Sequence, residues 1–319
     1  MPKVSVIIPT HSRPLSLLRA VESAHSAGSD VEVVVVDDAS RDATADVCKS
    51  MKDIKYVRLE RNQGVAGARN VGILASSADL IAFLDDDDLR LPGSLDAQIA
   101  ALSANREAGF VCGPVLLADE QGTLTGEVAA PQSPGGDVFW EIVELKFFLL
   151  PAAVVIRKDC FYRVGLFNSR IPGIDDWDMW ARVAELFPVV VVTDPVSIYR
   201  QPTPFSQQGS SALGRHLMAA VRHQPHLLAL PRSLSAPAGL RRQVRRNMRR
   251  RIADTLSWNA ARRLPEGAYR FALENFLAAV RLNPLWAARP EHFRQLYRSL
   301  LAQRDLKRSS VLPARADGA

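Results

Sequence analysis

Runs of apolar, mostly β-branched residues alternate with amphipathic stretches through the first half of the chain. The apolar runs show little period-two alternation, which is typical of strands covered on both faces. Helix-like stretches of about a dozen residues separate them. This order predicts βαβ units, and therefore an α/β fold with a mostly parallel sheet flanked by helices. The expected strands begin at Val4, Val31, Ile54, Leu80 and Phe110, and the expected helices span 14–27, 42–51, 65–76 and 92–104.

The second half of the chain changes character at about Pro202. Before it, residues 122–136 are rich in Gly, Pro and small polar residues and predict a loop or flap. Two further apolar runs, FFLLPAAVVI and PVVVVTDPVSIYR, flank the helix predicted to start in GIDDWDMWARVAELF. After Pro202 the pattern is helical, with helices expected at 212–230, 239–260, 266–282 and 290–303. The sequence thus predicts an α/β domain over 1–205 and a helical extension over 206–319.

Composition narrows the class of protein. The 319 residues are 47% hydrophobic, which is enough for a large core. The apolar run near the N-terminus is too short for a signal peptide, and the run at 147–156 is too short to cross a membrane. Cys48, Cys112 and Cys160 form no C-x-x-C pair, so neither a disulfide framework nor a zinc site is indicated. We therefore expect a cytoplasmic protein.

Basic residues are concentrated in RRQVRRNMRRR, residues 241–251. The net charge is +6, and this stretch of seven arginines contains no acidic residue. As a helix it would carry a basic face beside a stripe formed by Val244, Met248 and Ile252. Two interpretations remain open, a solvated face of the protein and a contact with anionic lipid head groups or another polyanion. Nucleic acid is disfavoured, because the stretch lacks interleaved aromatic residues.

The stretch LDDDDL, residues 84–89, places four carboxylates directly after a predicted buried strand. Strand alternation would point Asp85 and Asp87 one way, and Asp86 and Asp88 the other. Carboxylate oxygens suit Mg²⁺ or Mn²⁺, which proteins often hold with one or two carboxylates while a substrate diphosphate completes the shell. The alternative is an acidic turn that caps the helix beginning near residue 92. Four adjacent charges favour the cation, because their mutual repulsion raises some of their pKa values.

Two further stretches carry candidate binding residues. In VVVVDDAS, Asp38 or Ser40 could cap the helix that starts near residue 42, or Asp38 could accept hydrogen bonds from a nucleoside. In NQGVAGARNVG, Arg69 could reach a phosphate or base, or could be a surface ion-pair partner.

The helix start GIDDWDMW carries a carboxylate within its apolar face. At about 100° per residue, Asp176 falls among the apolar positions with Trp177 and Trp180, while Asp175 and Asp178 point away. Asp176 could be a first-turn acid held by backbone N–H groups. It could equally be a general base whose pKa is raised by desolvation.

Taken together, these motifs resemble the family 2 glycosyltransferases, which have the GT-A fold. The resemblance covers roughly residues 1–205, and each motif alone is loose while their order is specific. The matching segments are VSVIIPTHSRP, VVVVDDASRDAT, NQGVAGARNVG, AFLDDDDLRLPGSLDAQ with its D-x-D element, IDDWDMWARVA and YRQ.

The resemblance implies an inverting transfer of a sugar from a nucleotide diphosphate donor, often a UDP-sugar, to a hydroxyl acceptor. It assigns Asp176 as the base and Asp87 as the ligand of Mn²⁺ or Mg²⁺. The remaining assigned residues bind the donor, with two carboxylates near the ribose, the sugar or the ion; they are Pro9, Thr10, Asp38, Arg69, Asp85 and Asp86.

The sequence departs from the family pattern at three places. Asp175 stands where the family has Glu, and Pro202 follows Tyr199-Arg200-Gln201 where the family often has His. The processive Q-x-x-R-W signature is absent, which favours single transfers. By analogy with bacterial members, we expect an acceptor of cell-surface polysaccharide or lipid-linked type, at the inner membrane face.

Two other functions fit part of the sequence. Phosphoaspartate proteins, such as receiver domains and some phosphatases, also place aspartates after strands, but they need a Lys at a later strand end, and RKD at 157–159 is a poor candidate. A non-catalytic nucleotide-sugar-binding scaffold is the third hypothesis.

Overall fold

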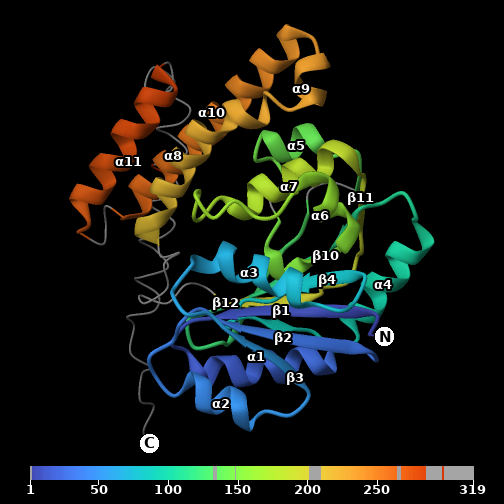
Figure 1. Ribbon diagram of the computed structural model, residues 1–319. Helices are drawn as coiled ribbons and strands as arrows, with labels where there is room; N and C mark the ends of the chain where they lie inside the picture. The colour runs from blue at the N-terminus through green and yellow to red at the C-terminus, as the bar shows by residue number, and fades with distance from the viewer. Residues whose placement is uncertain are drawn as a thin grey trace, which may run out of the picture. The chain divides into compact units, whose positions relative to one another are not determined.

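The computed structural model describes residues 2–131, 135–147, 149–200, 210–263 and 267–284, together with residue 297. It divides into two compact units, residues 1–241 and 242–319. Figure 1 shows the helices and strands along the chain.

An eight-stranded sheet forms the centre of the first unit. Four strands that follow the predicted βαβ order run parallel, in the spatial order β3-β2-β1-β4. Beyond β4 the sheet continues as β10-β6-β11-β9, with β10 antiparallel to both of its neighbours and β11 parallel to β6. The α/β fold with a mostly parallel sheet is thereby confirmed. The strands are β1 (Val4–Thr10), β2 (Val31–Asp37), β3 (Ile54–Arg58), β4 (Leu80–Phe83), β6 (Phe110–Cys112), β9 (Gly135–Gly136), β10 (Val154–Arg157) and β11 (Val189–Val191).

Helices cover both faces of this sheet because successive side chains of each strand point to opposite faces. Val4, Val6 and Ile8 of β1 pack in one core cluster with residues of two helices, α1 and α4. Ile7, on the opposite face, lies against Gly72 of α3. Figure 1 shows α1 and α3 on opposite sides of the strands. The helices are α1 (Pro14–Ser26), α2 (Thr44–Ser50), α3 (Gly64–Ala75) and α4 (Ser94–Ala104).

A second sheet, in the order β5-β12-β7-β8, lies beyond the acidic segment. β12 (Ser197–Arg200) pairs with β5 (Leu89–Arg90), so the end of the α/β region returns beside the four aspartates. The predicted loop or flap at 122–136 is corrected in part, because β8 (Leu124–Ala129) pairs antiparallel with β7 (Val115–Ala118). Every residue of β8 is exposed. The strand therefore has no buried face that would give it a recognisable apolar pattern in the sequence.

Further helices of the first unit follow the sheet strands. They are α5 (Phe139–Val143), the 3-10 helix η1 (Pro151–Ala153), α6 (Lys158–Val164), α7 (Asp175–Leu186), α8 (Ser210–Leu227) and α9 (Pro231–Ser235). α8 docks on α7 through His223, whose Nε2 lies 2.6 Å from Asp178 Oδ1. The boundary between the two compact units, after residue 241, therefore lies later in the chain than the boundary after residue 205 that the sequence predicts.

The second unit contains most of α10 (Ala238–Arg263) and all of α11 (Tyr269–Leu282). A buried stripe along α10 includes Val244, Met248 and Ile252, and α11 buries Ala272 and Ala279. The helices predicted at 239–260 and 266–282 are thus confirmed. Of the helix predicted at 290–303, only residue 297 is among the described residues.

Cys48, Cys112 and Cys160 are free and buried. Within the described ranges, no helix combines the length and the apolar character that a membrane crossing requires.

Replacement of Gly72 by Ala is expected to lower the free energy of unfolding by about 1–2 kcal/mol, measured by urea titration. A Cβ at this position would overlap Ile7 Cγ2, and overpacking a tight core costs about 1–3 kcal/mol, offset in part by the better helix propensity of Ala. Leu74→Ala on the same helix is the control, because Leu74 is 73% exposed and its loss should change stability by less than about 0.5 kcal/mol. An equal or larger loss for Leu74→Ala would contradict close packing of α3 on β1.

Candidate functional site

The four aspartates of LDDDDL leave the strand β4 and enter a turn. The Asp88 N–H donates to the Asp85 carbonyl at 3.0 Å, which closes the turn. Asp86 and Asp88 are buried, whereas Asp85 and Asp87 are partly exposed. Burial therefore alternates along the four residues, in the pairs that strand periodicity predicts.

Arg13 joins two of these carboxylates, and sequence reasoning missed it. Its Nη1 lies 2.9 Å from Asp86 Oδ1 and 2.9 Å from Asp87 Oδ2. The other oxygen of Asp86 accepts a hydrogen bond from the Thr10 hydroxyl at 2.7 Å. Both oxygens of Asp86 are thus held within the protein, and Asp86 fixes the turn. The position of Arg13 in the sequence could have indicated this contact, because Arg13 follows β1, a parallel neighbour of β4, at the same edge of the sheet.

Arg69 connects the acidic turn to the start of α7. The side chain is buried, Nη2 lies 2.6 Å from Asp85 Oδ1, and Nη1 lies 3.4 Å from Asp175 Oδ2. The guanidinium also lies over the ring of Phe167, 5.7 Å from its centroid. The interpretation of Arg69 as a surface ion-pair partner is therefore wrong. Arg69 is a buried cation between two carboxylates that are far apart in the sequence.

The predicted orientation of the acids on α7 needs correction. Asp175 and Asp178 are buried, and Asp176 is partly exposed. Asp175 accepts a hydrogen bond from Arg69, and Asp178 accepts one from Arg182. Both carboxylates were expected to point toward solvent, but they point toward these side chains. The prediction from helical periodicity assumed that only one face of α7 is covered. In the structure, Arg69 of α3 contacts α7 on one side, and α8 covers another.

Asp176 combines access to solvent with a raised pKa. One oxygen accepts the Trp177 N–H at 2.7 Å, as expected for a first-turn acid. Desolvation by the surrounding protein, and then the charge of Asp175, raise its pKa to about 7, while Arg69 opposes the shift. The charge of Asp85 also raises it, so Asp176 and the acidic turn interact electrostatically.

The acidic turn carries more negative charge than its arginines balance. Burial, opposed by Arg13, raises the pKa of Asp86 to about 6. The pKa of Asp87 is also raised, first by burial and then by the charge of Asp85. Burial, and then the charges of Asp85 and Asp87, raise the pKa of Asp88 well above its ordinary value. A further positive charge would therefore be favoured here.

Asp38 is buried at the end of β2 and holds the start of α3. Its two oxygens accept the backbone N–H groups of Gln63 at 2.6 Å and Gly64 at 2.9 Å. It does not cap the helix near residue 42, and the preceding Asp37 instead accepts the Ser40 N–H. Pro9, like Asp38, is buried at this edge. Contact of either residue with a nucleoside stays a prediction.

The strand β12 brings Arg200 to the same turn. The Arg200 N–H donates to Asp88 Oδ1 at 3.0 Å, and its Nη2 lies 4.0 Å from Asp87 Oδ2. Carboxylates of the turn, after burial, raise the pKa of Tyr199 far above its ordinary value. Tyr199 and Arg200 therefore belong to the site as well as to the strand; Gln201 lies outside the described residues.

The donor chemistry of the turn fits a divalent cation. Asp85 and Asp87 each contact arginine through one oxygen only, which leaves the second oxygen for another ligand. Two partly exposed carboxylates are the set with which proteins often hold Mg²⁺ alongside water and phosphate oxygens. No group of three or more His, Cys, Asp or Glu side chains in the described ranges is arranged to hold a metal by itself. Water and substrate oxygens would supply the remaining ligands.

Residues 5–134 match the model of glycosyl transferase family 2. This segment is a family 2 glycosyltransferase domain. The matched segment contains the acidic turn, Arg13, Asp38 and Arg69, whereas Asp176 lies after it.

Curated relatives of this chain include two with specific names. It is 41% identical over 203 residues to the succinoglycan biosynthesis protein ExoU of Rhizobium meliloti, covering 56% of each chain. It is 38% identical over 134 residues to the GalNAc(5)-diNAcBac-PP-undecaprenol β-1,3-glucosyltransferase of Campylobacter jejuni, covering 40% of this chain and 42% of that one. An uncharacterized glycosyltransferase of Rickettsia felis is 28% identical over 67% of this chain, which spans 36% of that protein.

A solved structure shares the fold. S. aureus TarS 1-349 in complex with UDP-GlcNAc has a TM-score of 0.57 at 16% identity, over 90% of this chain and 92% of that one. At this identity the likeness concerns the fold alone. The expected GT-A fold is confirmed.

The phosphoaspartate hypothesis finds no support at the site. Lys158 lies where β10 ends beside the beginning of β4, and its Nζ donates to the Ser76 carbonyl at 2.7 Å. The aspartates lie after the other end of β4. The segment RKD at 157–159 therefore does not supply the lysine that a phosphoaspartate site needs.

Proposed function

We propose that the chain is an inverting glycosyltransferase that moves a sugar from a nucleotide diphosphate donor, a UDP-sugar, to a hydroxyl acceptor. One observation carries the proposal: Arg69 ties Asp85 of the acidic turn to Asp175, next to the carboxylate whose pKa is raised to about 7. A cation and diphosphate site beside a poised base is the combination that inverting transfer requires.

Asp176 would act as the general base. Its carboxylate removes the proton of the acceptor hydroxyl while the acceptor oxygen bonds to the anomeric carbon. The bond from that carbon to the diphosphate oxygen breaks on the opposite face, and the electron pair leaves with the diphosphate. A pKa near the working pH keeps the carboxylate ionised and still basic enough to accept the proton.

The acidic turn would bind the donor. A divalent cation, Mn²⁺ or Mg²⁺, held by Asp87, would neutralise charge on the departing diphosphate. Asp85 would lie near the ribose or the ion, and Asp86 would act through the turn that it fixes. The other residues proposed to line the donor site are Pro9, Thr10, Asp38 and Arg69.

The acceptor class is proposed by analogy. The named relatives act in succinoglycan biosynthesis and on an undecaprenol-linked saccharide. The aligned part of this chain spans 36%, 62% and 26% of three other curated relatives, so the activity of the whole protein is part of the proposal. We propose cell-surface polysaccharide or glycolipid synthesis in the cytoplasm, with peripheral association at the inner membrane face.

Thermal unfolding with UDP-, GDP- and dTDP-sugars, with and without Mn²⁺, tests donor binding. A ligand at 100 times its Kd stabilises the folded state by about 2.7 kcal/mol, which gives a shift of a few degrees. We expect a shift with UDP-sugars that requires Mn²⁺, and Asp87→Asn should remove the metal-dependent part. Asp159→Asn, at an exposed position of α6, is the matched control and should retain it. Indifference of the wild type to all nucleotides would contradict the proposal.

A further inference from the structure

Five arginines of the second unit line one groove. α10 supplies Arg242, Arg245, Arg246, Arg249 and Arg250, and Leu282 and Asn283 at the end of α11 also line it. The groove encloses about 480 Å³. Val244 and Met248, between these arginines in sequence, are buried on another side of α10. The packing of the helix therefore leaves the basic face open.

The charges of these five arginines are not neutralised by the part of the chain that the structure describes. No ion pair joins any of them to an acidic side chain of the described residues. Arginine elsewhere in the second unit does find a partner, since Arg270 Nε lies 3.1 Å from Glu274. Arg242 and Arg246 are spaced i, i+4, as are Arg245 and Arg249, and like charges at this spacing destabilise a helix. Helix stability thus does not explain the arrangement, whereas an external anion would.

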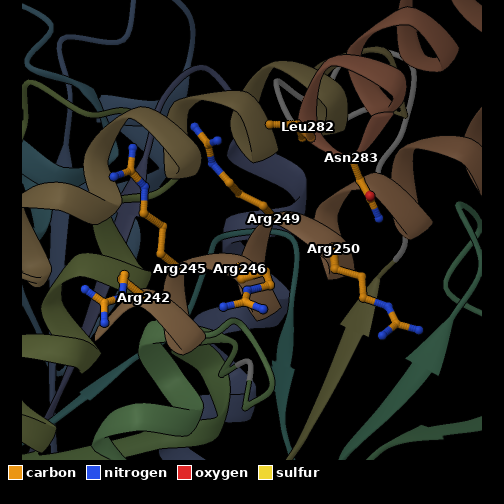
Figure 2. A pocket seen from close by; sticks show the side chains of 7 residues that line it. All are labelled: Arg242, Arg245, Arg246, Arg249, Arg250, Leu282 and Asn283. Carbon is orange, nitrogen blue, oxygen red and sulfur yellow. The ribbon is translucent and has the colours of Figure 1, made fainter. Parts of the chain in front are cut away.

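The spread of the guanidinium groups identifies the kind of anion. Figure 2 shows them distributed along α10 and pointing in different directions, not toward one centre. From Arg242 to Arg250 the helix axis covers about 12 Å. One phosphate group cannot reach all five, but an array of separate phosphates can. Guanidinium binds phosphate through paired hydrogen bonds, so each arginine suits one head group.

Base recognition is disfavoured by the lining of the groove. Among the described residues that line it, none carries an aromatic side chain on which a base could stack, and those besides arginine are Leu282 and Asn283. A bilayer surface needs no such contacts, because polybasic segments bind it through charge alone.

We infer that the arginine groove, Arg242, Arg245, Arg246, Arg249 and Arg250, is a docking surface for the phosphate head groups of an anionic lipid bilayer. It extends the proposed function, in which the acceptor is a cell-surface polysaccharide or a glycolipid, and gives the proposed membrane association a defined surface. Vesicle binding is measured without donor or turnover, so its failure is separate from a failure of the proposed activity.

Vesicle flotation with the full chain tests the inference. The chain should bind vesicles of phosphatidylcholine with phosphatidylglycerol, release them at high salt, and ignore pure phosphatidylcholine. Each basic residue near such a surface contributes about fivefold in affinity, so R245Q/R246Q/R249Q should weaken binding on the order of 100-fold. Removing like charges also relieves repulsion within α10, so this variant should fold; R242Q/R250Q is a second variant in the same groove and should weaken binding about 30-fold.

The matched control is R251Q/R270Q/R281Q, which removes the same charge from exposed positions of α10 and α11 outside the groove. We expect it to weaken vesicle binding by less than about tenfold. Three outcomes would overturn the inference: equal losses in control and groove variants, no loss in either groove variant, or tighter binding to an RNA oligonucleotide than to vesicles at the same salt. The last result would assign the groove to a nucleic acid.

Discussion

Replacement of Asp176 by Asn is expected to reduce sugar transfer by about 10²–10⁴-fold while donor binding changes little. The amide cannot accept the acceptor proton, and general-base catalysis contributes a factor of this size. Transfer by the wild type should fall as the pH drops below about 7, because protonation of Asp176 removes the base. Initial rates at saturating donor, together with the nucleotide-dependent thermal shift, separate the two effects. Asp159→Asn is the control and should transfer at the wild-type rate.

A second readout of Asp176 is stability against pH. The folded protein holds this proton up to about pH 7, whereas an unfolded chain releases it near the ordinary Asp value of about 3.9. Between these values the folded state binds more protons, so this group makes stability fall as the pH rises. Asp176→Asn should remove that contribution, so its stability relative to the wild type should be higher at pH 8 than at pH 4.

Unchanged turnover in Asp176→Asn would remove Asp176 from the role of base.

Replacement of Arg69 by Met is expected to lower the free energy of unfolding by about 3–5 kcal/mol at neutral pH. The change leaves Asp85 and Asp175 without their shared cation, and breaking a buried pair by removing one partner costs an amount of this order. Urea titration measures the loss. It should be smaller at low pH, because burial raises the pKa of Asp175 and the protonated Asp175 needs no counter-charge.

The double variant Arg69→Met/Asp175→Asn controls for the lost packing of Arg69. It removes one of the two stranded carboxylates, so it should be more stable than Arg69→Met alone. A loss below about 1 kcal/mol in Arg69→Met, or no recovery in the double variant, would show that Arg69 does not hold the two segments together. Donor binding should also weaken in Arg69→Met, since Asp85 would lose the contact that fixes it.

Local pattern was sufficient for the frame of the molecule. The predicted strands beginning at Val4, Val31, Ile54 and Leu80 all form, because alternation between β-branched runs and amphipathic stretches is a property of neighbouring residues. The strand β8 escaped prediction for the converse reason. Its side chains are exposed on both faces, and only the backbone register with β7 defines it.

The site shows where local pattern ends. The sequence by itself determined that carboxylates follow β4 and lie on the first turn of α7, since strand ends and helix starts are marked locally. Only the tertiary structure decided that Arg69 bridges Asp85 and Asp175, and that Arg13 bridges Asp86 and Asp87. These partners are separated by 106 and 73 residues for the Arg69–Asp175 and Arg13–Asp86 contacts. Sheet order and helix packing bring such residues together, and neither leaves a periodic signal at the residues themselves.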